Sequence, residues 1–114
     1  MPHRPYALGI DLGGTNAKVL AITHTGRVLA HASAPCGPAQ RAWKRAVREA
    51  VAEVRERMQG APSWTGVAAP GLPSADRRSI AIMPGRLQGL EGLVWRSLLR
   101  AATDVPVAMQ VIFA

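Results

Sequence analysis

The sequence has little of three features that often decide the class of a small protein: cysteine, aromatic residues and long apolar runs. Cys36 is the one cysteine among 114 residues, so no intramolecular disulfide can form and we expect an intracellular, cytoplasmic protein. Only 4% of the residues are aromatic, so a core has to be built from aliphatic side chains. No apolar run approaches the roughly 20 residues that a membrane span needs. The apolar stretch behind the amino terminus meets Asp11 after a few positions, which is typical of a buried strand and not of a signal peptide.

Acidic residues are also scarce. Fourteen Lys and Arg residues against seven Asp and Glu residues give a formal net charge of +7. Such an excess fits nucleic-acid binding, but the arginines are spread along the chain from Arg4 to Arg100. No helix-turn-helix pattern, zinc-ligand spacing or basic strand interleaved with aromatic residues accompanies them. A solvated, arginine-rich surface is therefore the simpler interpretation; we do not expect a nucleic-acid partner, and a basic nucleic-acid-binding module stays open as an alternative.

The apolar runs and the glycine and proline breaks predict one α/β domain over residues 1–114. Three strands open the chain as an antiparallel meander, and a helix with apolar residues every three or four positions follows. The fourth strand is uniformly small and apolar, which predicts burial on both of its faces. The expected strands are Ala7–Leu12, Ala17–Ile22, Arg27–Ala34, Thr65–Ala69 and Val105–Gln110, and the expected helices are Gly37–Met58 and Val94–Ala102.

The turn after the first strand carries the residues with the clearest chemistry. A loop that holds nucleotide phosphates has to offer several backbone N–H groups with no side chain in the way, and Gly13-Gly14-Thr15 provides that with an added hydroxyl. Both glycines suit a turn that needs positive φ. A carboxylate at Asp11 would repel phosphate unless Mg²⁺ lies between them. The predicted phosphate-binding residues are Asp11, Gly13, Gly14, Thr15, Asn16 and Lys18, with Asp11 also the metal ligand.

Spacing alone leaves a plain β-hairpin with a glycine turn open as the alternative. Two other phosphate loops are excluded by the sequence. It has no Gly-x4-Gly-Lys-Ser/Thr, so it is not a P-loop, and no Gly-x-Gly-x-x-Gly follows the first strand, as a Rossmann fold requires.

Four segments, in order, resemble the ROK family (repressor, open reading frame, kinase). Gly9–Lys18, which reads Gly-Ile-Asp-Leu-Gly-Gly-Thr-x-x-Lys, is similar to the opening motif of that family. Gly66–Leu72, Gly-Val-Ala-Ala-Pro-Gly-Leu, is similar to its Gly-hydrophobic-x-x-Pro-Gly strand and turn. Leu87–Gly92 and Val105–Val107 look like the segment that precedes its catalytic strand. The resemblance covers nearly the whole chain and implies the actin-like, ribonuclease-H-like ATPase fold, here as a lobe with a mixed five-stranded sheet and two helices.

The resemblance also implies a function. The complete enzyme would be a glucokinase-like sugar kinase that transfers a phosphoryl group from ATP to a sugar hydroxyl with Mg²⁺, and complete members of the family are often homo-oligomers. Pro70 and Gly71 would line the sugar side of the cleft. Arg86 stands where sugar kinases of the family commonly have an Asn that bonds a sugar hydroxyl; an Arg can donate to a hydroxyl but cannot accept from it. An exposed loop arginine is the alternative for Arg86.

The carboxyl end departs from the family pattern. The family continues after the Val-Pro-Val strand with Asn-Asp, whose Asp is the general base, whereas this sequence reads Gln110-Val-Ile-Phe-Ala114. We therefore expect an amino-terminal lobe without a catalytic base or second lobe, catalytically inactive by itself. A sugar-responsive regulator of the same family is the other alternative; such regulators carry a DNA-binding helix-turn-helix ahead of the phosphate motif, and here the first strand starts close to Met1.

Overall fold

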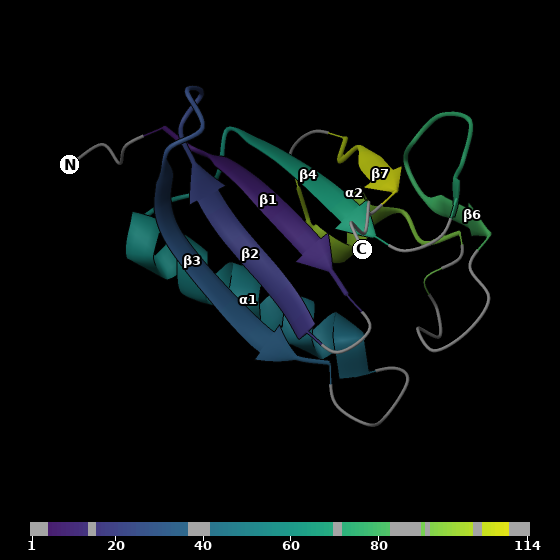
Figure 1. Cartoon of the computed structure of the whole chain (residues 1–114), viewed down its shortest axis with the longest axis horizontal. Coiled ribbons are helices and arrows are strands. Elements are labelled where there is room, and N and C mark those ends of the chain that lie inside the picture. The colour runs from purple at the N-terminus through teal and green to yellow at the C-terminus, as the bar shows by residue number, and fades with distance from the viewer. Residues whose placement is uncertain are drawn as a thin grey trace, which may run out of the picture.

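The computed structural model describes residues 5–13, 16–36, 42–69, 72–82, 90, 92–101 and 104–109. Seven strands and two helices are formed among these residues (Figure 1). The strands are β1 (Ala7–Leu12), β2 (Asn16–Ile22), β3 (Val28–Pro35), β4 (Trp64–Ala69), β5 (Leu72–Pro73), β6 (Ile80–Ile82) and β7 (Val107–Met109). The helices are α1 (Ala42–Met58) and α2 (Trp95–Leu99).

Five of the strands form one mixed sheet in the order β3-β2-β1-β4-β7. The meander β1-β2-β3 is antiparallel, β4 pairs parallel with β1, and β7 pairs parallel with β4. Because β1, β4 and β7 are parallel, their carboxyl ends share one edge of the sheet, the edge at which α/β folds usually bind ligands. This arrangement confirms the predicted α/β fold with a mixed five-stranded sheet, a meander start and two helices among the described residues.

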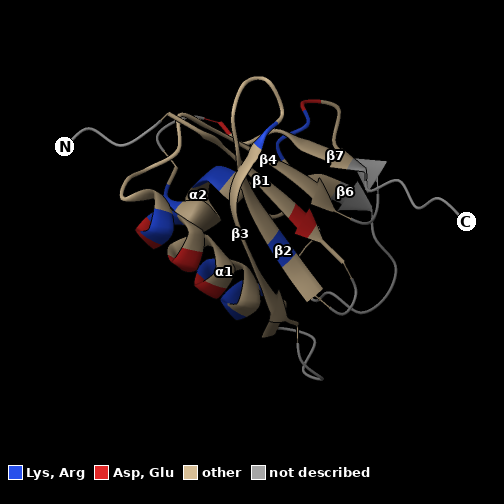
Figure 2. Cartoon of the chain, turned by 60° about the vertical axis from the view of Figure 1, so that its left-hand side comes forward, with Lys and Arg blue, Asp and Glu red and all other residues tan. Residues whose placement is uncertain are grey.

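Both helices pack on the same face of the sheet (Figures 1 and 2). The apolar stripe of α1 explains its position, since one side of the helix is buried against β2 and β3. Trp43, near the start of α1, packs against Trp95 of α2, with ring centroids 5.6 Å apart. The sheet contributes the alternate side chains of its strands to the same core, among them Leu8, Ile10 and Leu12.

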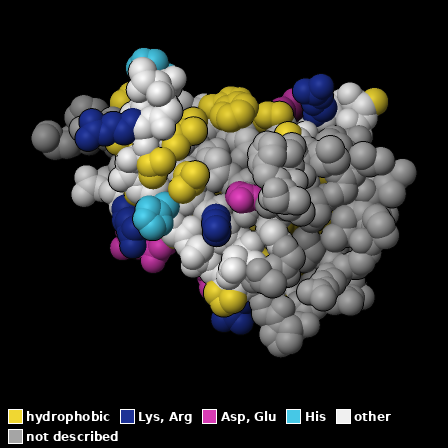
Figure 3. All heavy atoms as spheres, in the orientation of Figure 1, with side chains coloured by type: hydrophobic (Ala, Val, Ile, Leu, Met, Phe, Trp, Pro, Cys, Tyr) yellow, Lys and Arg dark blue, Asp and Glu magenta, His cyan; other side chains and the backbone are white. Residues whose placement is uncertain are grey.

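The other face of the sheet is open. The burial of β4 alternates between buried and exposed or half-buried positions, so the prediction that this strand is buried on both faces is wrong. Burial of β2 alternates in the same way, and Leu20 is 38% exposed. Figure 3 shows hydrophobic side chains exposed on this face, with an acidic side chain close to a basic one. Small apolar residues in β4 therefore mark a strand covered on one side only.

The chain departs from the predicted boundaries mainly in its second half. The second helix is shorter than expected, Trp95–Leu99, and the last strand is Val107–Met109. The strands β5 and β6 form a small antiparallel sheet that the sequence did not predict. The backbone N–H of Val107 donates to the carbonyl of Arg77 at 2.7 Å and so ties the loop between β5 and β6 to the main sheet. None of the helices among the described residues is long and apolar enough to cross a membrane.

Candidate functional site

Asp11 and Lys18 lie opposite each other on neighbouring strands. Their Cα atoms are register partners in the antiparallel pair β1–β2, so both side chains project from the same face, the open one. Figure 2 shows the acidic position of β1 beside the basic position of β2. Asp11 is half-buried and Lys18 is exposed. The strand register thus places the Lys18 side chain on the same face of the sheet as the Asp11 carboxylate.

The turn that joins these strands is closed by Gly13 and Asn16. The N–H of Gly13 donates to the carbonyl of Asn16 at 2.9 Å. The prediction of positive φ is wrong for Gly13, since among the described residues the glycines with positive φ are Gly26 and Gly92. What favours glycine at position 13 is space, because a Cβ there would lie 3.3 Å from the Asn16 carbonyl oxygen. With its N–H committed to the hairpin, Gly13 has no backbone donor left for a phosphate.

Five of the predicted site residues lie outside the described part of the chain: Gly14, Thr15, Pro70, Gly71 and Arg86. Their roles remain predictions. The described flanks of two of these segments are close in space, because β4 ends at Ala69 and its Ala68 is the register partner of Asp11. The structure therefore brings Asp11, Asn16 and Lys18 to the edge at which β4 also ends.

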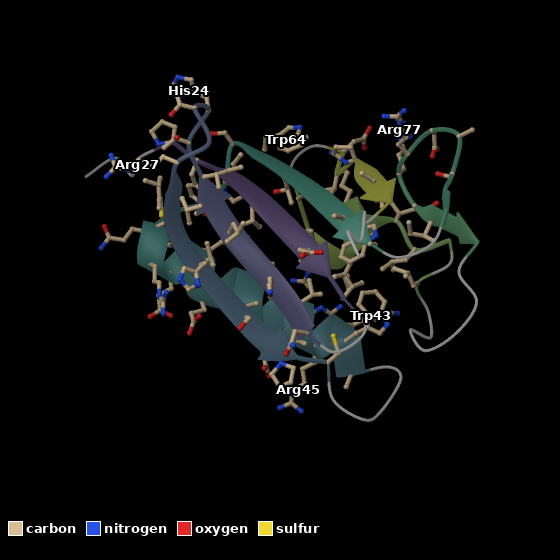
Figure 4. All side chains as sticks on the ribbon, in the orientation of Figure 1. His24, Arg27, Trp43, Arg45, Trp64 and Arg77 are labelled. Carbon is tan, nitrogen blue, oxygen red and sulfur yellow. The ribbon has the colours of Figure 1, made fainter. Side chains whose placement is uncertain are left out.

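A groove of about 540 Å³ runs along the open face beside Asp11. Arg77 and Trp64 line it together with small residues of β1, β4 and β7, and Asp11 is the one carboxylate among the described residues of its lining. The Trp64 indole lies over Gly66, so that a Cβ at Gly66 would be 2.7 Å from the ring. Figure 4 shows Trp64 at the start of β4 and Arg77 on the β5–β6 loop.

Trp64 and Arg77 are functional candidates that the sequence reasoning did not identify. A partial signal existed for Trp64, because Gly66 two positions later lies on the same face of the strand and leaves room for a large ring. No signal existed for Arg77, since its place in the groove depends on the unpredicted β5–β6 sheet.

Cys36 lies under the hairpin, where its thiol donates to the carbonyl of Gly13 at 3.7 Å. Burial raises the pKa of the Cys36 thiol, which disfavours the thiolate needed for nucleophilic attack. His24 is an exposed residue of the turn between β2 and β3. Among the described residues no three His, Cys, Asp or Glu side chains gather into a metal site. The hairpin therefore offers a single carboxylate and a single cation on one open face.

Solved structures of known proteins share this fold, although the sequence matches no protein-family model and no curated protein. A ROK family glucokinase from Streptomyces griseus, in complex with glucose and AMPPNP, superposes with a TM-score of 0.72 at 21% identity over 90% of this chain and 32% of its own. An inorganic polyphosphate/ATP-glucomannokinase from Arthrobacter sp. strain KM has a TM-score of 0.64 at 25% identity, over 93% of this chain and 44% of its own.

A ROK family transcriptional regulator, a homologue of the E. coli MLC protein, also shares the fold. Its TM-score is 0.66 at 17% identity, over 91% of this chain and 27% of its own. The chain thus spans less than half the length of each of these three proteins. The resemblance to the ROK family, with its actin-like ATPase fold, is confirmed at the level of the fold.

Proposed function

We propose that the chain is the phosphate-binding lobe of an ATP-dependent, glucose-type sugar kinase of the ROK kind. The observation that carries the proposal is the placement of Asp11 and Lys18 side by side on the open face of the sheet, at the end of β1 and beside the Gly13–Asn16 turn. The backbone donors of the loop would come from Gly14, Thr15 and Asn16. Gly13 closes the hairpin through its N–H, which donates to the Asn16 carbonyl.

Mg²⁺ fits the residues present. Magnesium is usually held by one or two carboxylates and completes its shell with water and substrate phosphates. Asp11 supplies one such carboxylate, half-buried at the edge of the sheet and beside an open groove. When bound, the ion would neutralise phosphate charge during phosphoryl transfer. Lys18, one strand away, would add a second positive charge, and Asp11 would keep the metal at the end of β1.

The sugar side of the site is proposed on the resemblance. Pro70 and Gly71 would follow β4 at the edge where Asp11 lies, and Arg86 would donate hydrogen bonds to sugar hydroxyls. Phosphoryl transfer depends on holding two substrates and a metal in one closed site. Asp11 is the one carboxylate among the described residues of the groove and is assigned to the metal, so we propose that a separate base and a second lobe complete the enzyme.

A nucleotide titration followed by amide NMR tests this assignment. Adding AMPPNP and Mg²⁺ to the chain should shift the amide signals of Asn16, Lys18 and Ala68 and leave those of the exposed face of α1 unchanged. Shifts confined to α1, or spread evenly over the chain, would contradict the proposed site.

A kinase assay tests the second part of the proposal. With ATP and a panel of hexoses, we expect no turnover from the 114-residue chain above the enzyme-free background. Turnover at an ordinary kinase rate, about 1–100 s⁻¹, would show that the chain carries a complete active site.

A sugar-responsive regulator is the second candidate, favoured by the shared fold of the ROK family transcriptional regulator. The two candidates differ in the ligands that the chain binds. A regulator would bind sugar without a requirement for nucleotide, so glucose binding in the absence of any effect of AMPPNP would favour it over the kinase.

A further inference from the structure

The face of the sheet that carries the helices has a second concave surface, far from Asp11. A groove of about 640 Å³ lies between α1 and α2. It continues into a recess of about 160 Å³ that reaches the start of β4, and the two share Val51, Arg55, Leu99 and Arg100. We name this continuous surface the arginine groove, after Arg48, Arg55 and Arg100 in its lining.

The three arginines have their guanidinium groups available. None of them makes a side-chain ion pair or hydrogen bond with another described residue, whereas Arg45 and Arg57 on the same helix pair with Glu49 and Glu53. Arg55 is also close enough to Tyr6 to oppose the rise that burial causes in the pKa of that phenol. The arginine groove is therefore a concentration of unpaired positive charge in a concave site.

Helix geometry explains why no carboxylate neutralises this charge. Arg48 and Arg55 are seven residues apart, so they lie on the same side of α1 at a separation of about 10 Å along its axis. The glutamates of the helix, Glu49, Glu53 and Glu56, point roughly 80–140° away from Arg48 around the axis. The charges of α1 are thus sorted into a basic stripe toward α2 and a mixed stripe toward solvent.

Thr65 is the second, independent sign of a binding site. Its side chain lines the recess and is 5% exposed, the one buried polar or charged residue among those described. Its hydroxyl makes no hydrogen bond with another described residue. The Thr65 oxygen is not among the fully enclosed polar side-chain atoms that lack a partner, so it is accessible from the recess, where its hydroxyl can donate to a ligand oxygen.

We propose that the arginine groove binds a small phosphate-bearing polyanion with at least two phosphoryl groups. Arg55 and Arg100 line both the recess and the outer groove, so one phosphoryl group would bind where the two join. There it would accept hydrogen bonds from both guanidinium groups, whose planar arrangement of N–H donors matches phosphate oxygens. Thr65 donates to the same group from inside the recess. Arg48 and Ser97, farther along the groove, contact the second group.

A nucleic acid fits the arginine groove less well. A duplex carries one charge per roughly 1.7 Å and is bound by long basic surfaces. The unpaired arginines of α1 extend over only about 10 Å, and the glutamates of the neighbouring stripe would repel a longer polyanion. The length of the basic stripe thus favours a small ligand.

Calorimetric titration with sodium tripolyphosphate, in EDTA and about 100 mM salt, tests the proposal. We expect binding of one equivalent, at least tenfold tighter than that of orthophosphate. Arg55→Gln and Arg100→Gln should each weaken tripolyphosphate binding at least tenfold, and Thr65→Val should weaken it about threefold. Arg48→Gln should weaken tripolyphosphate binding but not orthophosphate binding, because it contacts only the second group.

Arg45→Gln is the matched control, since it removes the same charge from the same helix on the stripe that faces solvent. It should change the affinity less than twofold, and circular dichroism should show every variant folded. Amide NMR should map the binding to Ser97, Leu99 and Thr65. An equal loss of affinity in Arg45→Gln, shifts at Gly13 and Asn16 instead, or equally tight binding of a 12-base-pair DNA would each overturn the proposal.

Discussion

The two faces of the sheet should contribute unequally to the free energy of unfolding, and truncating one leucine on each face measures the difference. Leu12 of β1 is fully buried on the helix side, whereas Leu20 of β2 is 38% exposed on the open side. Leu→Ala removes three carbons worth about 0.8 kcal/mol each when buried, or about 2.4 kcal/mol, and the remaining cavity raises the cost to about 3–5 kcal/mol for Leu12. Scaled by its burial, Leu20→Ala should cost about 1.5 kcal/mol, without a cavity term because solvent fills the space.

Urea and thermal denaturation, both followed by circular dichroism, check this difference in the free energy of unfolding. A chain of this length has a total stability of about 6–17 kcal/mol, so both variants should remain folded enough to measure. The melting temperature should fall by about 12–20 °C for Leu12→Ala and about 6 °C for Leu20→Ala. Equal costs for the two variants would refute the reasoning, since they would show that the open face is packed against something in solution.

Two further predictions concern residues around the hairpin and the groove. Cys36 should react slowly with a thiol reagent at pH 8 and faster in urea. The reason is that burial raises the pKa of the Cys36 thiol and so lowers the fraction present as thiolate. Equal reaction rates in buffer and in urea would contradict this. Gly66→Ala should displace the half-exposed Trp64 ring, since the new Cβ would lie 2.7 Å from it, and shift tryptophan emission to longer wavelength with little loss of stability; unchanged emission would show that the ring does not rest on Gly66.

The sequence predicted those parts of the fold that depend on local pattern. The strand Ala7–Leu12 has the predicted bounds, and α1 ends at Met58 as expected. Both are marked by a strong apolar pattern and by a glycine close to their ends. The ion pair between Glu53 and Arg57, at 3.8 Å, is a local contact of the same kind, since residues at i and i+4 of a helix are neighbours.

The features that the sequence did not predict depend on contacts between segments that are distant in the chain. The β5–β6 sheet pairs strands of two and three residues, too short to give a period. The small apolar residues of β4 are compatible with a strand that is buried on both faces or on one face. Which of the two holds depends on the elements that pack against the sheet, and these cover one face of β4. The N–H of Gly13 was expected to be free, but the hairpin register commits it to Asn16. The arginine groove needs α1, α2 and β4 together, so no sequence window contains it.

The magnesium dependence of AMPPNP binding tests the central claim, that Asp11 and the hairpin form a metal-nucleotide site. Calorimetry on the chain should show binding at least tenfold tighter with Mg²⁺ than with EDTA, a difference of about 1.4 kcal/mol or more. Asp11→Asn should lose that difference, whereas Asp104→Asn, a half-exposed carboxylate paired with Arg78 and Arg96, should keep it. Magnesium dependence that persists in Asp11→Asn would contradict the assignment of Asp11 as the metal ligand.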